Sequence, residues 1–206
     1  MSFTVIDRET WSRREYFEHY LTVVPCTYSL TTNIEITAIK RQGRRLYPSM
    51  LYHLTKAVNR LEQFRMAFRP DGTLVRYDAM SPCYTVFHRE TETFSNLWTE
   101  FTDDYDCFCQ RYEADMARFG PVEKMTAKPD MPENCFTVSM LPWVSFEGFN
   151  LNCASYDYLL PIFTLGKYRE TGGRRFIPLA IQVHHAVCDG YHVSRFIQAL
   201  QESINC

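Results

Sequence analysis

Apolar and polar residues recur along the chain with two different periods, and together these periods predict a mixture of helices and strands. Near the C-terminus an almost uninterrupted apolar run covers 176–183 and predicts a buried strand. Farther on, four apolar residues recur at i, i+3, i+4 and i+7, as in an amphipathic helix: Val193, Phe196, Ile197 and Leu200. The segment 184–190 therefore occupies a tight turn between a strand and a helix.

The same two periods predict the other elements. Helical spacing predicts a helix over 11–24, which stops before Pro25, and a second helix over 48–64, which begins at Pro48. One or two further helices are predicted over 94–119. Strand patterns occur over 28–39, 83–88, 136–141 and 149–153. Two hairpins are predicted from their turn residues, Pro70-Asp71-Gly72 between 65–68 and 73–77, and Thr171-Gly172-Gly173 between 162–169 and 174–183.

This succession of strands and helices predicts one α+β domain over residues 1–206. We expect a two-layer α/β sandwich in which a mixed β-sheet packs against helices. At 206 residues and 24.3 kDa the chain is long enough for one well-buried core. The longest predicted loop covers 120–133, and the sequence contains no internal repeat and no low-complexity linker.

Charge and hydropathy exclude several classes of partner. The formal net charge is −2, so neither nucleic acid nor an anionic membrane is expected as the main partner. The N-terminus lacks the charged start and apolar stretch of a signal peptide. No apolar segment of the sequence approaches the length of a membrane span. We therefore expect a cytoplasmic protein.

Eight cysteines are spread along the chain without the short repeated spacings of a zinc site. Cys107 and Cys109 fall in a predicted helix, where residues two apart do not share a face. We expect reduced thiols that are mostly buried as small hydrophobic side chains. Neither a disulfide framework nor a metal site is expected from them.

The turn after the apolar run holds the residues best suited to chemistry. Successive strand residues point to opposite sides, so His184 and His185 cannot both face one cavity. We expect His185 to be a general base, because neutral imidazole accepts a proton near physiological pH. Asp189 is expected to cap the following helix, and Gly190 to supply a backbone geometry or close approach that a Cβ would prevent. A nucleophilic Cys188 is disfavoured because no acid or base is spaced to serve it.

Residues 182–192, Gln-Val-His-His-Ala-Val-Cys-Asp-Gly-Tyr-His, resemble the signature of the classical trimeric type of chloramphenicol acetyltransferase. The shorter pattern His-His-x-x-x-Asp-Gly is shared by other coenzyme A-dependent acyltransferases, including dihydrolipoyl acyltransferase cores and peptide-synthetase condensation domains. Further segments match the narrower family in order: 11–17, Pro25-Cys26, 87–94, Leu141-Pro142-Trp143 and 149–152. The resemblance extends from Trp11 to Glu202 and is weakest over 102–131.

The resemblance implies acetyl transfer from acetyl-CoA to the 3-hydroxyl of chloramphenicol, which inactivates the antibiotic. His185 would take the hydroxyl proton, with its other ring nitrogen bonded to its own carbonyl, and the oxygen would attack the thioester in a ternary complex. Ser139 would donate to the tetrahedral oxyanion, and Thr164 would hold a water beside it. Asp189 would pair with Arg13 and hold the turn.

The resemblance also implies how the substrates bind and how subunits assemble. The acceptor pocket would be lined by Tyr20, Val24, Tyr28, Leu151 and Cys153. Tyr168 would lie close to the coenzyme. Some relatives carry Leu, Phe and Val where this chain has Val24, Tyr28 and Cys153. These differences leave the pocket of this chain mostly apolar. Family members are homotrimers with active sites at subunit interfaces, His185 coming from one subunit and most of the acceptor pocket from its neighbour. Acetyl-CoA would be a co-substrate, and neither a permanently bound cofactor nor a metal is expected.

Other functions fit parts of the pattern. An acyltransferase of the same fold could act on another hydroxyl or thiol, such as a dihydrolipoyl arm. A metal-dependent hydrolase would use His185, Asp189 and His192 as zinc ligands, but the sequence offers no second shell for that cluster. A catalytically inactive binder would sequester hydrophobic drugs. An acetyltransferase built from hexapeptide repeats is excluded because the sequence has no such repeat.

Overall fold

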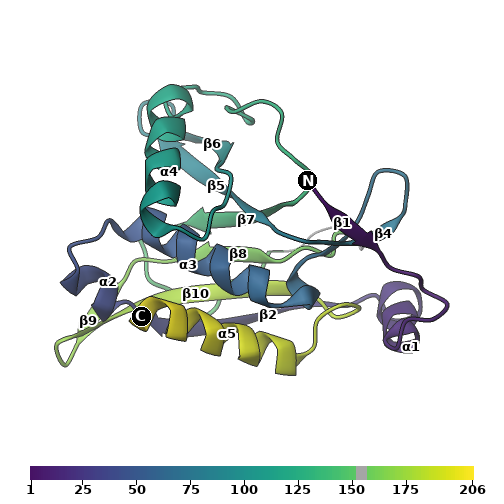
Figure 1. Ribbon diagram of the computed structural model, residues 1–206. Coiled ribbons are helices and arrows are strands. Elements are labelled where there is room, and N and C mark those ends of the chain that lie inside the picture. Colours follow the sequence, from purple (N-terminus) through teal and green to yellow (C-terminus); the bar gives the residue numbers. More distant parts are fainter. Residues whose placement is uncertain (152–156) are drawn as a thin grey trace.

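A mixed β-sheet of seven strands forms the middle of the molecule (Figure 1). The computed structural model describes residues 1–151 and 157–206. The strands of this sheet are β2 (Thr27–Glu35), β5 (Ser81–His88), β6 (Thr93–Trp98), β7 (Cys135–Met140), β8 (Ile162–Leu165), β9 (Arg169–Thr171) and β10 (Arg174–His184). They follow in the order β2-β10-β8-β7-β5-β6, and β9 pairs with β10. Strand β7 runs parallel to both β5 and β8, whereas the other pairs are antiparallel.

A smaller sheet lies beside the large one and contains three short strands. These are β1 (Phe3–Val5), β4 (Leu74–Tyr77) and β3 (Met66–Phe68), in that order. Both of their pairings are antiparallel. The sheet therefore attaches the N-terminal segment to the hairpin that was predicted at Pro70-Asp71-Gly72.

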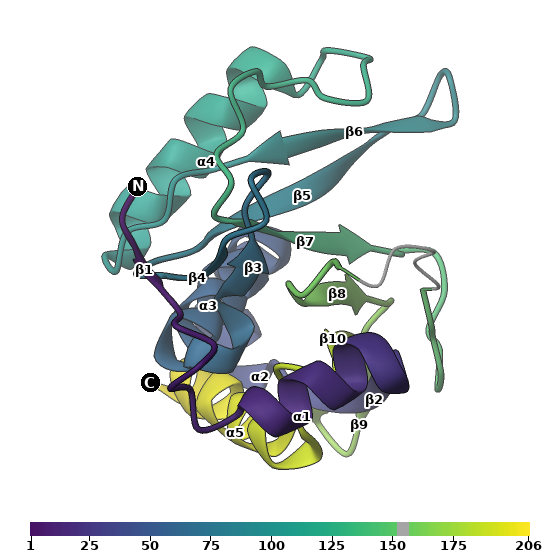
Figure 2. The same ribbon diagram turned by 90° about the vertical axis from the view of Figure 1, so that its right-hand side faces the viewer.

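Helices cover one face of the large sheet. They are α2 (Thr37–Arg41), α3 (Leu46–Arg60), α4 (Tyr105–Phe119) and α5 (Gly190–Asn205), and a further short helix is α1 (Arg14–Glu18). Helices α3 and α5 lie side by side, and the turned view in Figure 2 shows both on the same side of the sheet. Helix α1 continues into a π-helix over His19–Val23 and lies at the end of the molecule where β10 leads into α5. None of the helices in the described part of the chain is both long and apolar enough to cross a bilayer.

Alternation along the central strands divides their side chains between two faces. Phe136 in β7 and Phe163 in β8 are fully buried, with ring centroids 5.6 Å apart. The Phe163 ring also lies 5.0 Å from Phe196 of α5, so these positions face the helices. Each such buried ring stabilises the fold by about 1.5–3 kcal/mol. Ser139 and Thr164 have the opposite parity and therefore lie on the face away from the helices.

The predicted strand over 28–39 is too long, because it ends at Glu35 and is followed by α2. Ile36 and Ile39 are both fully buried. Residues three apart share one side of a helix but fall on opposite sides of a strand. A helical turn is thus the conformation that buries both isoleucines.

The prediction of one or two helices over 94–119 is only partly right. Residues 105–119 form α4, but 94–98 belong to β6, which pairs antiparallel with β5. Phe94 and Trp98 are four residues apart, and that spacing puts two side chains on one face of a strand as well as of a helix. The rings therefore could not distinguish the two structures, and pairing with β5 decided between them.

Three further boundaries differ from the prediction. Helix α3 begins at Leu46, so Pro48 lies within its first turn, where a missing N–H is tolerated. The predicted strand over 162–169 ends at Leu165. No strand forms over 149–151, where the Leu151 N–H donates to the side chain of Gln182, and the rest of that predicted strand lies outside the described residues.

Both hairpin turns are confirmed, and their glycines adopt the left-handed conformation. Gly72 has φ 80° between β3 and β4, and Gly172 and Gly173 have φ 59° and 73° between β9 and β10. All cysteines within the described ranges are free thiols, and Cys153 lies outside those ranges. The mixed sheet with helices on one face confirms the predicted α+β class.

Candidate active site

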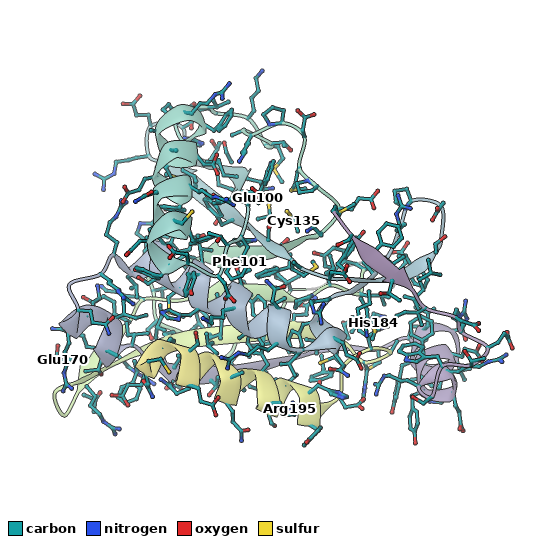
Figure 3. The ribbon with its side chains drawn as sticks, in the orientation of Figure 1. Glu100, Phe101, Cys135, Glu170, His184 and Arg195 are labelled. Carbon is teal, nitrogen blue, oxygen red and sulfur yellow. The ribbon has the colours of Figure 1, made fainter. Side chains whose placement is uncertain are left out.

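The turn between β10 and α5 carries His185 at the end of the sheet. Strand β10 ends at His184, which is 1% exposed and lies at the end of the molecule near α1 (Figure 3). Its carbonyl accepts from the N–H groups of Val187 and Cys188 at 3.2 Å and 3.0 Å. The His185 N–H donates to the Cys26 carbonyl at 2.9 Å, and its side chain is 28% exposed. One of the two adjacent histidines is thus buried, and the other is accessible.

An arginine and an aspartate clamp this turn. Arg13 donates to the two carboxylate oxygens of Asp189 at 2.7 Å and 2.6 Å. The same guanidinium donates to the carbonyls of His185 at 3.0 Å and Ala186 at 2.8 Å. The rigid fork of donors in arginine suits it to hold several acceptors at once. The Arg13 hydrogen bonds keep the pKa of Asp189 below its usual value, so Asp189 stays ionised at neutral pH.

The surroundings of His185 determine which ring nitrogen can accept a proton. Nδ1 is buried, makes no hydrogen bond of good geometry within the described chain, and lies 3.3 Å from Asp189 Oδ1. The implied bond from Nδ1 to the residue's own carbonyl is absent, and Arg13 occupies that carbonyl instead. A carboxylate can only accept, so it favours the tautomer with hydrogen on Nδ1. Nε2 then keeps its lone pair for a proton.

Two tyrosine rings fix the plane of the His185 imidazole. Tyr20 stacks on it with ring centroids 3.9 Å apart and an interplanar angle of 5°. Tyr28 meets it edge-on at 5.4 Å, and its hydroxyl donates to the Cys188 carbonyl at 3.3 Å. Burial raises the pKa of Tyr28, so this phenol remains protonated. Tyr20 lies in the π-helix, a wide turn that is frequent at functional sites.

A second group of side chains lies on the sheet face away from the helices. Ser139 Oγ and Thr164 Oγ1 are 3.0 Å apart across the parallel strands β7 and β8. Ser139 also borders a largely apolar cavity of 410 Å³, whose walls include Phe87, Trp143 and, from helix α4, Tyr112 and Met116. The rings of Phe87 and Trp143 are in contact, with centroids 4.7 Å apart. A serine hydroxyl held in this way can donate to the carbonyl oxygen of a thioester.

The strand register separates these two groups within one chain. Ser139 pairs with Thr164 in β8, and Thr164 pairs with Ala180 in β10. His185 follows Ala180 by five positions, which corresponds to about 16 Å along a strand. Two strand spacings add about 10 Å across the sheet. His185 and Ser139 of the same chain are therefore too far apart to act on one bond.

The residues implied for the acceptor pocket divide between the same two groups. Val24 follows the π-helix that carries Tyr20, and it is 50% exposed. Leu151 donates its backbone N–H to Gln182 Oε1 at 3.0 Å and lines a narrow cavity with Thr164. Tyr20 and Val24 thus accompany His185, whereas Leu151 accompanies Ser139.

Three other implied residues stand apart from these groups. Tyr168 lies beneath the Lys40 ammonium, which is 4.9 Å from the ring centroid. Cys153 lies outside the described residues. Gly190 begins α5 without a left-handed φ, and a Cβ there would meet no atom within 4 Å. The expectation that Gly190 needs a special backbone geometry or a close approach is therefore wrong for a single chain.

His192 belongs to this site in a way that the sequence analysis missed. The sequence suggests His192 only as a zinc ligand of the alternative hydrolase, and residues 1–151 and 157–206 contain no group of three or more side chains that could hold a metal ion. Instead, His192 Nδ1 accepts the backbone N–H of Asp189 at 3.0 Å. The third position after a helix N-cap commonly holds a side chain that accepts this N–H, usually Glu or Gln. The three-residue spacing between Asp189 and His192 is the feature of the sequence that indicates this capping role.

Comparisons with known proteins agree on one family. The family model described as chloramphenicol acetyltransferase matches residues 1–201. The chain is 57% identical to a chloramphenicol acetyltransferase of Campylobacter coli over 206 residues, covering 100% of both proteins. It is 45% identical to chloramphenicol acetyltransferase 3 of Escherichia coli, over 100% of this chain and 98% of that protein.

Two solved structures share the fold. A chloramphenicol acetyltransferase matches with a TM-score of 0.86 and 22% identity, over 98% of this chain and 100% of that one. A dihydrolipoamide acetyltransferase of Azotobacter vinelandii matches with a TM-score of 0.68 and 19% identity, over 93% of this chain and 86% of that one. At such identities the likeness establishes the architecture alone.

Proposed function

Because the chain belongs to the chloramphenicol acetyltransferase family, we propose that it transfers the acetyl group of acetyl-CoA to the 3-hydroxyl of chloramphenicol with His185 as general base. Members of this family are acyltransferases that acetylate chloramphenicol. The observation that carries the finer proposal is the environment of His185, an accessible imidazole held with Nε2 free to accept a proton. Acetylation would inactivate the antibiotic, so the protein would confer resistance.

The first chemical step is transfer of the acceptor hydroxyl proton to His185 Nε2. The ring is held by Tyr20 and Tyr28, so its lone pair keeps one direction. The Asp189 carboxylate, 3.3 Å from Nδ1, stabilises the positive charge that the imidazole gains. Arg13 balances that carboxylate and prevents it from taking the proton itself. A positioned general base typically contributes about 10²–10⁴ in rate.

The acceptor oxygen then attacks the carbonyl carbon of the thioester. A carbon–oxygen bond forms and the carbonyl oxygen becomes an oxyanion, to which the Ser139 hydroxyl donates. Thr164, 3.0 Å from Ser139, orients that hydroxyl and would hold a water beside the oxyanion. Collapse of the intermediate breaks the carbon–sulfur bond, and the coenzyme A thiolate takes the proton from the His185 imidazolium. Both substrates are bound together, so no acyl-enzyme forms.

The working enzyme in this proposal is a homotrimer with an active site at each subunit interface. The distance between His185 and Ser139 within one chain supports this assembly, because only a neighbouring subunit can bring a Ser139 to His185. Exposed apolar side chains next to Ser139, above all Trp143 at 59% exposure, suit burial against a partner. Tyr20, Val24 and Tyr28 would accompany His185, and Leu151 would come from the subunit of Ser139.

Acetyl-CoA is the co-substrate in this proposal, and no cofactor is bound permanently. Its acetyl end would reach the Ser139 hydroxyl, which lies beside Thr164 on the sheet face away from the helices. The exposed ring of Tyr168 with Lys40 above it offers a surface for stacking and a positive charge for a coenzyme phosphate. An enzyme that consumes acetyl-CoA works where that metabolite is available, so a cytoplasmic location is expected.

A thiol-release assay with acetyl-CoA and chloramphenicol tests the proposal. We expect release with the wild type only when chloramphenicol is present, and His185→Ala should lower kcat by about 10²–10⁴ while acetyl-CoA still binds. His19→Ala, which removes an exposed imidazole beside Tyr20, is the matched control. Wild-type kcat in His185→Ala would rule out this base.

The same assay separates the alternative functions. Release with dihydrolipoamide but not with chloramphenicol would indicate another acyltransferase of this fold. Tight binding of chloramphenicol without an acetylated product would indicate a binding protein.

A further inference from the structure

His192 accepts the hydrogen bond that holds the start of α5. The Asp189 backbone N–H donates to His192 Nδ1 at 3.0 Å, and the His192 backbone N–H donates back to the Asp189 carbonyl at 2.9 Å. Asp189 is the N-cap of the helix, where backbone N–H groups lack helical partners. Because Nδ1 must be unprotonated to accept, the neutral imidazole is the form that fits this arrangement.

The hydrogen bond between His192 and Asp189 is linked to His185 through Asp189 and Arg13. His192 fixes the backbone of Asp189, and both carboxylate oxygens of Asp189 bind Arg13 at 2.7 Å and 2.6 Å. Arg13 in turn donates to the His185 carbonyl at 3.0 Å. The Asp189 carboxylate also lies 3.3 Å from His185 Nδ1. A shift of the Asp189 backbone would therefore displace both groups that hold the imidazole.

We propose that His192 is a positioning residue for the general base: its neutral ring holds Asp189 where the Arg13 clamp and His185 require it, and its protonation releases that hold. This inference rests on the proposed function, in which His185 takes the acceptor proton. His192 itself contacts no substrate in this scheme. It acts through the backbone of Asp189.

Charged groups from several elements face the His192 ring. Asp189 Oδ2 lies 3.7 Å from Nδ1 and, with Glu62 of the turn after α3, favours the protonated form. Arg13 before α1 and Arg195 of α5, which is labelled in Figure 3, oppose it. Burial is the largest influence, and the pKa of His192 is lowered from its usual value. The ring is thus neutral at neutral pH, whereas at acid pH two N–H donors would face each other.

The test compares His192→Ala and His192→Gln with the wild type in steady-state acetylation of chloramphenicol. At neutral pH we expect His192→Ala to lower kcat by about ten- to a hundredfold, because small misplacements of catalytic groups cost this much, with KM for chloramphenicol nearly unchanged. His192→Gln should keep most of kcat, since glutamine is a common acceptor for the N-cap N–H. Ser194→Ala is the matched control, because the Ser194 hydroxyl donates to the Gly190 carbonyl at 2.8 Å and not to the Asp189 backbone.

The pH profile separates positioning from a general structural role. Glutamine cannot be protonated, so the ratio of wild-type kcat to His192→Gln kcat should fall as the pH is lowered from about 7.5 to about 5.5. A constant ratio would overturn the inference, as would wild-type kcat in His192→Ala or a His192→Gln variant as slow as His192→Ala. If His192→Ala does not fold, the pH dependence of the ratio between wild-type kcat and His192→Gln kcat still tests the inference. Failure of the proposed function is seen separately, as wild-type kcat in His185→Ala.

Discussion

The imidazole of His185 is held from three directions, by the stacked ring of Tyr20, the edge of Tyr28 and the carboxylate of Asp189. A histidine free in water rotates and exchanges its two tautomers. Here the ring plane is fixed, and the carboxylate beside Nδ1 favours hydrogen on that nitrogen. At the scale of the residue, the proposed basicity at Nε2 therefore depends on a carboxylate four positions away and on two tyrosine rings that are distant in sequence.

Ser139→Ala should slow acetyl transfer strongly without abolishing it. We expect kcat to fall on the order of a hundredfold, because one oxyanion donor is worth about 2.7–4 kcal/mol in related chemistry. KM for acetyl-CoA should change little, since the hydroxyl would act on the oxyanion rather than on the bound thioester. Initial rates of thiol release check this, with circular dichroism to verify the fold. An unchanged kcat would remove Ser139 from the mechanism.

Among the elements, the helix pair α3 and α5 contains a polar contact within its apolar interface. His53 Nδ1 and Ser203 Oγ are 2.8 Å apart, and His53 is 4% exposed. Its Nε2 makes no hydrogen bond to any described group. Burial, followed by the charges of Arg44 and Lys56, lowers the pKa of His53 to about 4. The neutral ring is thus compatible with the packed helices, whereas the protonated ring is not.

This buried histidine should make the fold sensitive to acid. Below about pH 6.5 the unfolded chain binds the His53 proton and the folded chain does not, so stability falls until the folded pKa of about 4 is reached. The loss should approach about 3 kcal/mol over that window. His53→Gln cannot titrate and should lose less stability over the same range. Urea midpoints at fixed protein concentration check this, and identical pH dependences would contradict it.

Gly166 is the point where β8, β10 and the segment after Trp143 come together. A Cβ there would lie 2.6 Å from Pro178 Cγ and 2.8 Å from Phe146 Cε1. Gly166→Ala should therefore destabilise the fold by about 1–3 kcal/mol, the usual cost of overpacking. Gly148→Ala, where a Cβ meets nothing within 4 Å, is the matched control. Equal thermal midpoints for the two variants would contradict this account.

For the whole molecule, the main consequence of the fold is that one chain holds two separate halves of the proposed chemistry. His185 lies at the end of β10, and Ser139 lies level with Ala180 on the face of the sheet away from the helices. The helices cover the other face (Figure 2). A ring of subunits related by head-to-tail contacts can bring each His185 to a Ser139 of its neighbour and satisfy every such contact.

Mixed oligomers test this arrangement directly. When His185→Ala and Ser139→Ala chains are produced together, about one site in four should combine an intact His185 with an intact Ser139, if subunits assort at random. The purified mixture should then have about a quarter of wild-type activity per site. Separately purified variants that are mixed without exchange of subunits are the control. Activity no higher than the mean of the two variants would argue against a site shared between chains.

Periodicity alone determined several features of this protein. The apolar run before His184, the spacing after Gly190 and the two glycine turns define β10, α5 and both hairpins. The alternation of strand residues also indicated that His184 and His185 do not face one cavity, and the structure buries His184 and leaves His185 accessible. These features depend on local backbone geometry, which a short window of sequence records.

The tertiary structure, and not local patterns, decided which distant groups meet. Arg13 and Asp189 are 176 positions apart, no periodicity links them, and their pairing was expected from the family resemblance alone. The type of β6, the short helix around Ile39 and the capping role of His192 depend likewise on partners elsewhere in the chain. The separation of Ser139 from His185 follows from the pairing register of three strands. Register and packing arise from contacts between remote segments, and local patterns do not encode these contacts.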